Sequence, residues 1–212
     1  MRMRKKPNLL PRLESCRQVC IEKPELMKGR WLEEFSGFDE LRLELGCGKG
    51  RFTAETAMEN PDVLFIAVER VPEAAVVAME RVSAAKLGNV RFLVMDVSNL
   101  TECFDNGELS QIYINFCDPW PKNRDAKRRL TSHIFLPVYK MLIGDGELHF
   151  KTDNVPLFDY SLKQFRLFGF SVSETTKNLH ENGIVGVMTD YEDKFQKLGK
   201  PICRCVAKVG EG

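Results

Sequence analysis

The fold is decided by the stretch Leu41-Arg42-Leu43-Glu44-Leu45-Gly46-Cys47-Gly48-Lys49-Gly50, in which an apolar-rich run leads directly into three glycines. A glycine-rich turn between a strand and a helix lets the backbone approach a ligand closely and points free N–H groups at it. The fingerprint of NAD-binding folds would need a glycine at position 51, which is Arg51, and the Gly-Lys-Ser/Thr of a phosphate-binding loop is missing. The turn therefore argues against both a dinucleotide and a nucleoside triphosphate.

From Leu41 onward, apolar runs of strand length alternate with segments of helical pattern, which is typical of βαβ units around a mostly parallel sheet. Seven strands are predicted, at Leu41–Leu45, Leu64–Glu69, Val90–Met95, Gln111–Phe116, Glu147–Thr152, Phe170–Ser173 and Ile202–Val206. Four helices are predicted, at Arg51–Glu59, Pro72–Ala85, Arg128–Ile143 and Pro156–Phe168. Residues 177–200 have no clear period and are predicted to be a loop, with one helical turn at the most.

Composition indicates an ordinary globular protein: 31 Lys and Arg against 30 Asp and Glu give a net charge of +1 over 212 residues. No window approaches the roughly 20 apolar residues that a membrane-spanning helix needs, and the N-terminus lacks the apolar core of a secretion signal. The seven cysteines are scattered, without a Cys-x-x-Cys pair, which favours reduced thiols in the cytoplasm and no metal site.

Charge is uneven along the chain. Up to Trp31 the sequence has nine basic residues, including Arg2, Arg4, Lys5 and Lys6, and only three acidic ones. We expect residues 1–40 to form a basic arm with a leading helix that contacts nucleic acid, and residues 41–212 to form a single domain.

Acidic side chains stand at the ends of the first three predicted strands: Glu44, Glu69 and Asp96. Glu69 follows the glycines by about 20 residues, where a carboxylate can accept hydrogen bonds from both hydroxyls of a ribose. One strand-end acid alone is weak evidence, but three in register favour a cofactor cleft.

Asp118-Pro119-Trp120-Pro121-Lys122 follows the fourth predicted strand, and a basic run with Lys127-Arg128-Arg129-Leu130 comes next. Two further motifs lie later in the chain, Lys151-Thr152-Asp153-Asn154 and Thr189-Asp190-Tyr191-Glu192. These four motifs resemble those of one family, the tRNA (guanine-N7-)-methyltransferases, and the glycine turn resembles the cofactor loop of S-adenosylmethionine-dependent methyltransferases. The resemblance implies a Rossmann-like class I methyltransferase fold, an α/β architecture with a seven-stranded, mostly parallel sheet and helices on both faces. It also implies methyl transfer from S-adenosylmethionine to N7 of guanine 46 in the variable loop of tRNA.

The resemblance implies the following site residues. Asp118 is the expected catalytic residue, and the cofactor is expected to contact Glu44, Gly46, Gly48, Gly50, Glu69, Asp96 and Asp118. The substrate is expected to contact Lys122, Asp153, Thr189, Asp190, Tyr191 and Glu192, and RNA to contact Asn123, Arg124, Lys127, Arg128 and Arg129. Family members commonly carry a second Lys and a His where this chain has Asn123 and Asp125, which reduces the local positive charge.

The chemistry requires positioning more than proton transfer, because guanine N7 has a free lone pair and the sulfonium methyl is already activated. Asp118 is therefore expected to orient the base, although Asp153 or Glu192 is an equal candidate for contacting the guanine edge. Trp120 or Tyr191 offers an aromatic surface for a base that has left its stack.

Two other functions remain open from the sequence. One is a methyltransferase of the same fold that acts on DNA adenine or a small molecule, although the adenine class has Pro where Trp120 stands. The other is an RNA-binding module without catalytic activity. The resemblance to single-subunit bacterial members implies tRNA as the partner, a monomer or homodimer, and no obligate protein partner.

Overall fold

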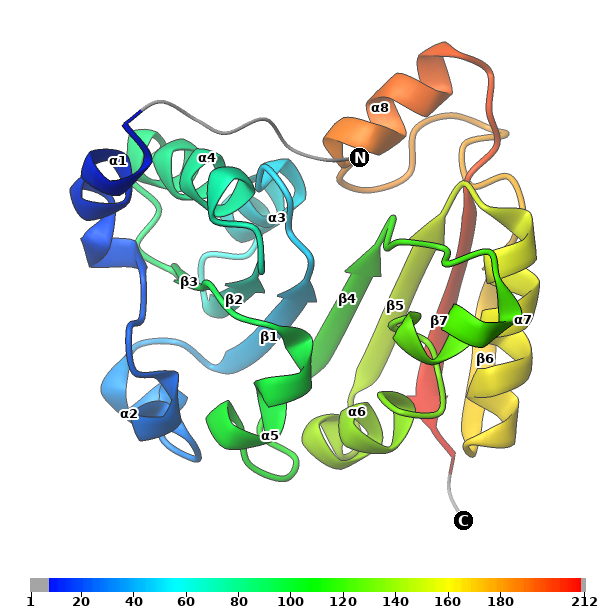
Figure 1. Ribbon diagram of the computed structural model, residues 1–212, viewed down its shortest axis with the longest axis horizontal. Helices are drawn as coiled ribbons and strands as arrows, with labels where there is room; N and C mark the ends of the chain where they lie inside the picture. The colour runs from blue at the N-terminus through cyan, green and yellow to red at the C-terminus, as the bar shows by residue number, and fades with distance from the viewer. Residues whose placement is uncertain (1–7, 211–212) are drawn as a thin grey trace. The chain divides into compact units, whose positions relative to one another are not determined.

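The computed structural model describes residues 8–210, and its strands form one sheet in the order β3-β2-β1-β4-β5-β7-β6 (Figure 1). The strands are β1 (Glu40–Leu45), β2 (Val63–Val68), β3 (Val90–Leu93), β4 (Gln111–Asn115), β5 (Glu147–Thr152), β6 (Phe170–Thr176) and β7 (Cys203–Val209). Pairing is parallel between β1 and β2, β2 and β3, and β4 and β5, whereas β7 is antiparallel to β5 and β6. The predicted seven-stranded, mostly parallel α/β fold is confirmed.

The chain divides into two compact units, the first ending at Asp105 and the second beginning at Asn106. The described helices of the first unit are α1 (Leu9–Ser15), α2 (Trp31–Glu34), α3 (Arg51–Glu59), α4 (Pro72–Ala84), α5 (Leu100–Cys103) and the 3-10 turns η1 (Arg17–Val19), η2 (Pro24–Met27) and η3 (Val97–Asn99). Those of the second are η4 (Asn123–Arg128), α6 (Leu136–Ile143), α7 (Val155–Leu167) and α8 (Asp190–Lys197). Arg2, Arg4, Lys5 and Lys6 of the predicted basic arm lie outside the described residues.

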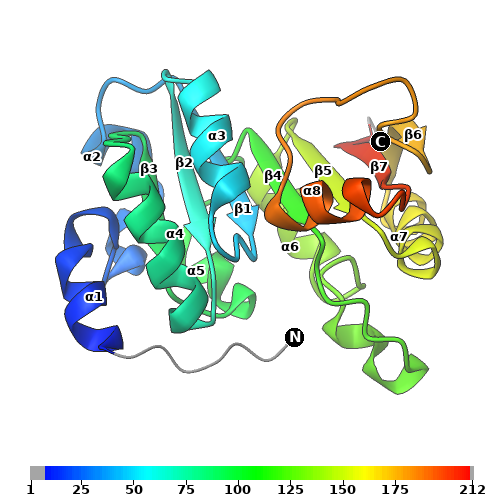
Figure 2. The same cartoon turned by 90° about the horizontal axis from the view of Figure 1, so that it is seen from above.

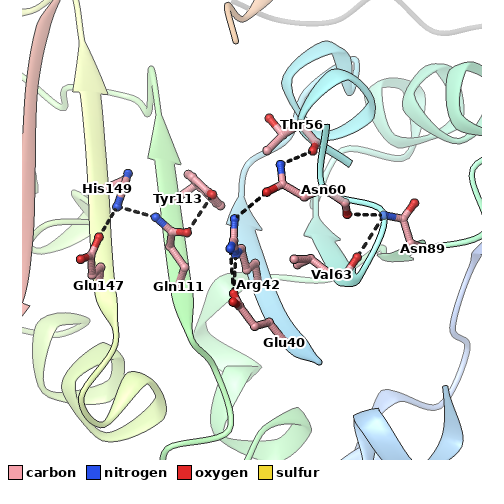
Figure 3. A network of polar contacts seen from close by, with 10 residues as sticks. All are labelled: Glu40, Arg42, Thr56, Asn60, Val63, Asn89, Gln111, Tyr113, Glu147 and His149. Carbon is pink, nitrogen blue, oxygen red and sulfur yellow. Dashed lines mark hydrogen bonds and ion pairs between the residues drawn. The ribbon is translucent and has the colours of Figure 1, made fainter. Parts of the chain in front are cut away.

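The core of the first unit forms around β2, of which every residue is buried. Burial on both faces is what a central parallel strand requires, and it explains the unbroken apolar run of its sequence. The side-chain amide of Asn89 donates to the carbonyls of Ala57, Asn60 and Val63, each at 3.0 Å, and so ties the end of α3 and the start of β2 to β3. Figure 3 shows the bonds to Asn60 and Val63.

In the second unit, side chains alternate between the two faces of the strands. One face carries Phe150, whose ring centroid lies 6.1 Å from that of Phe158 on α7, so α7 covers this face. The other face carries a polar chain in which Gln111 contacts His149 and His149 contacts Glu147 at 2.7 Å (Figure 3). This alternation places Lys151, two residues beyond His149, on the polar face at the carboxyl end of β5.

The predicted helix over Arg128–Ile143 is wrong in its first half. Helix α6 begins only at Leu136, with Pro137 in its first turn. Proline fits there because its missing N–H needs no helical partner, whereas inside a longer helix it would break the hydrogen-bond ladder. The other three predicted helices are confirmed, with ends shifted by one residue at most.

The prediction for residues 177–200 is also wrong in part, because α8 has eight residues there. Thr189 caps it, accepting a hydrogen bond from the Glu192 N–H while the Glu192 carboxylate accepts from the Thr189 N–H. The Thr-x-x-Glu spacing is the signature of such a capping box. Strand β6 also continues to Thr176 and β7 to Val209, beyond their predicted ends.

No helix in the described range, residues 8–210, is long and apolar enough to cross a membrane.

Replacing Gly50 by Ala is expected to destabilise the protein more than replacing Gly107 by Ala. Both glycines have a left-handed backbone, with φ of 71° and 67°, so both substitutions carry the same backbone strain. A Cβ at Gly50 would lie 2.6 Å from the Cβ of Ala78 on α4, whereas one at Gly107 would meet nothing within 4 Å. The overlap should add about 1–3 kcal/mol to the loss at Gly50, measured by urea unfolding. Equal losses for the two variants would contradict this explanation.

Candidate cofactor and substrate site

The glycine turn after β1 has the open backbone that a ligand needs. Gly46, Gly48 and Gly50 all have positive φ, at 78°, 58° and 71°. A Cβ at Gly46 or Gly48 would meet nothing within 4 Å, so there is free space beside the backbone. The N–H groups of Gly46 and Cys47 donate to the carbonyl of Val68 at 2.8 and 3.1 Å and fix the turn to the end of β2.

The carboxylate of Glu69 holds this turn in place. It accepts a hydrogen bond from the Gly48 N–H at 3.0 Å and another from the Val71 N–H at 2.9 Å. The side chain is only half-buried, so oxygen lone pairs remain for a ligand, since a carboxylate has about four acceptor positions. The structure thus brings Glu69 together with the glycine turn.

The other two acids of the first unit differ in exposure. Glu44 is 2% exposed and accepts a hydrogen bond from the Thr53 hydroxyl on α3. Asp96 is exposed and accepts from the Ser98 N–H at 3.0 Å and the Ser98 hydroxyl at 2.8 Å. These hydrogen bonds, helped by Arg70 at 3.8 Å, lower the pKa of Asp96, which stays ionised. Of the two, only Asp96 presents a charged group to solvent.

Cys47, in the middle of the turn, is not a nucleophile. Its side chain is buried, and burial raises the pKa of the thiol well above its ordinary value. A neutral, enclosed thiol has little reactivity.

The loop after β4 carries Asp118 between two residues with left-handed backbone, Phe116 at φ 53° and Trp120 at φ 40°. This conformation is unusual for aromatic residues and costs of order 1–3 kcal/mol at each position. Asp118 itself is exposed. Strain at two sites around an exposed carboxylate indicates a loop shaped for function.

Arg129 holds this loop. Its guanidinium donates to the carbonyl of Pro119 at 3.0 Å and to that of Trp120 at 3.0 and 3.3 Å, and it lies 4.2 Å from the centre of the Tyr160 ring. The side chain is 9% exposed. Arg129 is therefore placed to fix the loop that carries Asp118, whereas the sequence predicted that it contacts RNA.

The other four residues predicted to contact RNA are exposed: Asn123, Arg124, Lys127 and Arg128. Lys122, which was predicted to contact the substrate, is exposed beside them. The Arg128 guanidinium lies 4.7 Å from the centre of the Trp120 ring, so one basic residue of η4 also contacts the Asp118 loop.

A buried ionic network lies beyond the carboxyl end of β5, where α8 crosses the ends of β4 and β5 (Figures 1 and 2). The Glu192 carboxylate is 0% exposed, and Lys151 Nζ approaches its two oxygens at 3.0 and 3.3 Å. His180 Nε2 lies 2.9 Å from Glu192 Oε1, and Lys151 also donates to the Val187 carbonyl at 3.0 Å. Of the predicted substrate residues, Thr189 and Glu192 are thus enclosed in this network, whereas Asp153 is half-buried and Asp190 and Tyr191 are exposed.

Sequence reasoning missed Lys151, His180, Phe116 and Phe195, which all contact predicted site residues. Lys151 is the first residue of the Lys151-Thr152-Asp153-Asn154 motif, but nothing in the sequence indicates that it pairs with Glu192, 41 positions away.

The chain is similar to known proteins over nearly its whole length. A family model described as a putative methyltransferase matches residues 39–205. The chain is 43% identical over 206 residues to a tRNA (guanine-N(7)-)-methyltransferase of Bacillus velezensis, covering 96% of this chain and 95% of the relative. It is also 43% identical over 209 residues to one from Geobacillus thermodenitrificans, covering 98% and 97%.

Solved structures resemble the fold at low sequence identity. The 16S rRNA methyltransferase KamB matches with a TM-score of 0.65 and 14% identity, over 86% of this chain and 94% of that one. The antibiotic-resistance methyltransferase Kmr matches with a TM-score of 0.58 and 19% identity, over 87% and 93%. These likenesses show the class I methyltransferase fold.

Replacing Arg129 by Gln is expected to reduce the free energy of unfolding by about 1.5–3 kcal/mol, because the carbonyls of the half-buried residues Pro119 and Trp120 lose a charged donor. Arg124→Gln, at an exposed residue of the same segment, should change it by less than about 0.5 kcal/mol. Chemical unfolding of both variants measures the difference. If Arg129→Gln were as stable as Arg124→Gln, Arg129 would not hold the loop.

Proposed function

The chain belongs to the tRNA (guanine-N7-)-methyltransferase family, and we propose that it transfers the methyl group of S-adenosylmethionine to N7 of guanine 46 in the variable loop of tRNA. It is an S-adenosylmethionine-dependent methyltransferase. The observation that carries the choice of site is the exposed Asp118 carboxylate on a strained loop that Arg129 fixes from within.

The cofactor is assigned to the glycine turn of the first unit. Gly46 and Gly48 leave room beside their backbone, and Glu69 keeps acceptor capacity for ribose hydroxyls. The exposed, ionised Asp96 is assigned to the adenine amino group. Glu44 and Gly50 are assigned to stabilise the turn. Glu44 accepts a hydrogen bond from Thr53, and Gly50 packs closely against Ala78. When bound, the cofactor supplies an activated methyl group on a positively charged sulfur.

The protein needs no general base for this reaction, because guanine N7 already has a free lone pair. The bound cofactor would supply a methyl group activated by a positively charged sulfur, and transfer of that methyl group would leave the positive charge on the purine. We assign Asp118 to orient the guanine through N1–H and the exocyclic amine and to stabilise the positive charge that develops. Of the two other carboxylates considered for the guanine edge, Asp153 is half-buried in the turn after β5 and still reaches solvent, whereas Glu192 is fully engaged inside the protein.

The exposed cations Lys122, Arg124, Lys127 and Arg128, with Asn123 among them, are assigned to the phosphates of tRNA. Arg129 is assigned to the loop rather than to RNA. We further propose one catalytic domain over residues 41–212 preceded by a basic arm, and action in the cytoplasm as a monomer or homodimer without an obligate protein partner.

Replacing Asp118 by Asn is expected to reduce methyl transfer by roughly 10²- to 10³-fold, because a preorganised charge next to the reacting base is lost. Labelled methyl transfer from S-adenosylmethionine to unmodified tRNA, with guanine or adenine at position 46, measures it. The matched control is Asp145→Asn, which should keep full activity. Asp145 is an exposed carboxylate between α6 and β5, before the amino end of β5.

Labelled 7-methylguanine only from the guanine-containing tRNA would support the proposal. Transfer to duplex DNA instead would favour an adenine methyltransferase, and tRNA binding without cofactor binding would favour an RNA-binding module without catalytic activity.

Replacing Arg124 and Lys127 together by Gln is expected to weaken tRNA binding and to reduce the slope of log K against log salt by about 0.7–0.9 for each lost phosphate contact. Lys163→Gln, an exposed cation on α7, should leave the slope unchanged. Filter binding between low and moderate salt measures both. An unchanged slope in the double variant would remove η4 from the RNA interface.

A further inference from the structure

We propose that Tyr191 is the surface on which the methyl-accepting guanine stacks, and that Phe116, Phe195 and a buried network of Lys151, Glu192 and His180 position it. The proposal rests on the proposed function, since it names the protein surface that the substrate base occupies. Phe116, Phe195, Lys151 and His180 are positioning residues that act through Tyr191 or through the helix that carries it.

Tyr191 is the exposed member of an aromatic cluster. It lies in the first turn of α8 and is 50% exposed. Its ring is stacked on that of Phe116 with centroids 6.3 Å apart, and on that of Phe195 with centroids 6.4 Å apart. The ring centroids of Phe116 and Phe195 are 6.1 Å apart, and both residues are only half-buried. Such a cluster gives a large, rigid apolar surface that is open to solvent on one side, which suits a planar base.

The cluster is joined to the loop that carries Asp118. Phe116 is two residues before Asp118, and its N–H donates to the carbonyl of Lys151 at 2.9 Å. Its left-handed backbone, at φ 53°, turns the chain sharply at the end of β4. The same residue therefore directs its ring to Tyr191 and sets the course of the loop toward Asp118.

The buried network fixes the helix that carries Tyr191. Glu192 is next to Tyr191 in the chain. Its carboxylate oxygens lie 3.0 Å from Lys151 Nζ and 2.9 Å from His180 Nε2. It also accepts the Thr189 N–H at 3.1 Å. A carboxylate that is 0% exposed needs several such partners, because burial of an unpaired charge is costly. The first turn of α8 is thereby held against β5 and against the loop of His180.

The protonation of His180 follows from its two contacts. The Val185 N–H donates to its Nδ1 at 3.2 Å, so Nδ1 carries no proton. Nε2 therefore carries the proton and donates it to Glu192. His180 thus joins the turn of residues 180–185 to α8, because its Nδ1 accepts from Val185 and its Nε2 donates to Glu192.

Trp120 is the competing aromatic surface near Asp118. The guanidinium of Arg128 lies 4.7 Å from the centre of the Trp120 ring, and the Trp120 carbonyl accepts a hydrogen bond from Arg129. A base that stacked on it would have to displace the guanidinium from that face or share the ring with it. Tyr191 is therefore the better surface.

The first test compares Tyr191→Leu with Tyr191→Phe. Loss of an aromatic face should reduce kcat/KM for tRNA by roughly 5- to 150-fold in Tyr191→Leu, whereas Tyr191→Phe, which keeps the ring, should stay within about twofold of wild type. The control is Phe168→Leu, a half-buried aromatic after the far end of α7, which should keep full activity. Equal activity of the Leu and Phe variants would overturn the proposal.

A second readout separates stacking from stability. Transfer RNA with 2-aminopurine at position 46 fluoresces more strongly when that base is unstacked, so its emission in complex should be quenched by wild type and Tyr191→Phe but not by Tyr191→Leu. His180→Gln keeps a donor for Glu192 and should retain more quenching and a higher kcat than His180→Ala at equal saturation with tRNA. If His180→Ala lost thermal stability alone, with kcat and quenching unchanged, the network would have no positioning role.

The outcomes distinguish the two proposals. If wild type methylates guanine 46 and Tyr191→Leu does so equally well, only the stacking surface is wrong. If wild type transfers no methyl group to guanine 46, the proposed function is wrong, and quenching that still depends on Tyr191 would show that the surface binds a base for another purpose.

Discussion

The loops that leave the carboxyl ends of the strands have backbone groups without partners in the sheet, and charged side chains supply those partners. Glu69 accepts from the N–H groups of Gly48 and Val71, and Arg129 donates to the carbonyls of Pro119 and Trp120. Buried or half-buried backbone polar groups cost free energy unless they are paired, so each loop depends on one well-placed charge. The shape of the candidate site therefore depends on residues that were expected to contact ligands directly.

This dependence separates the acidic residues by role. Glu44 and Glu192 are almost fully buried, and their carboxylates are satisfied inside the protein. Asp96 and Asp118 are exposed, and hydrogen bonds from Ser98 keep Asp96 ionised by lowering its pKa. A motif alone cannot make this distinction, because the buried and the exposed carboxylates are equally regular in sequence. Exposure decides which acid is available to a ligand.

Most of the fold was predictable because its signals are local. Apolar runs marked all seven strands, and three closely spaced glycines marked the turn after the first one, where the structure has positive φ at each glycine. Helix α8 has a local signal too, because Thr189 to Glu192 is both a family motif and the spacing of a capping box. The missed site residues have no local signal, since the pairing of Lys151 with Glu192 and the stacking of Phe116 on Tyr191 join segments far apart in the chain. Such contacts depend on the tertiary fold.

Strain and burial together explain why these distant contacts matter for methyl transfer. The left-handed backbone at Phe116 and Trp120 is unfavourable by itself and persists only because Arg129 and the Lys151 carbonyl hold the loop. A loop held in this way loses little further freedom when substrate binds. For a reaction whose nucleophile needs no activation, reduced freedom of the reacting groups is the main source of acceleration that a protein can offer. The energy spent on an unusual backbone thus serves the one requirement of this chemistry, which is accurate placement of the base.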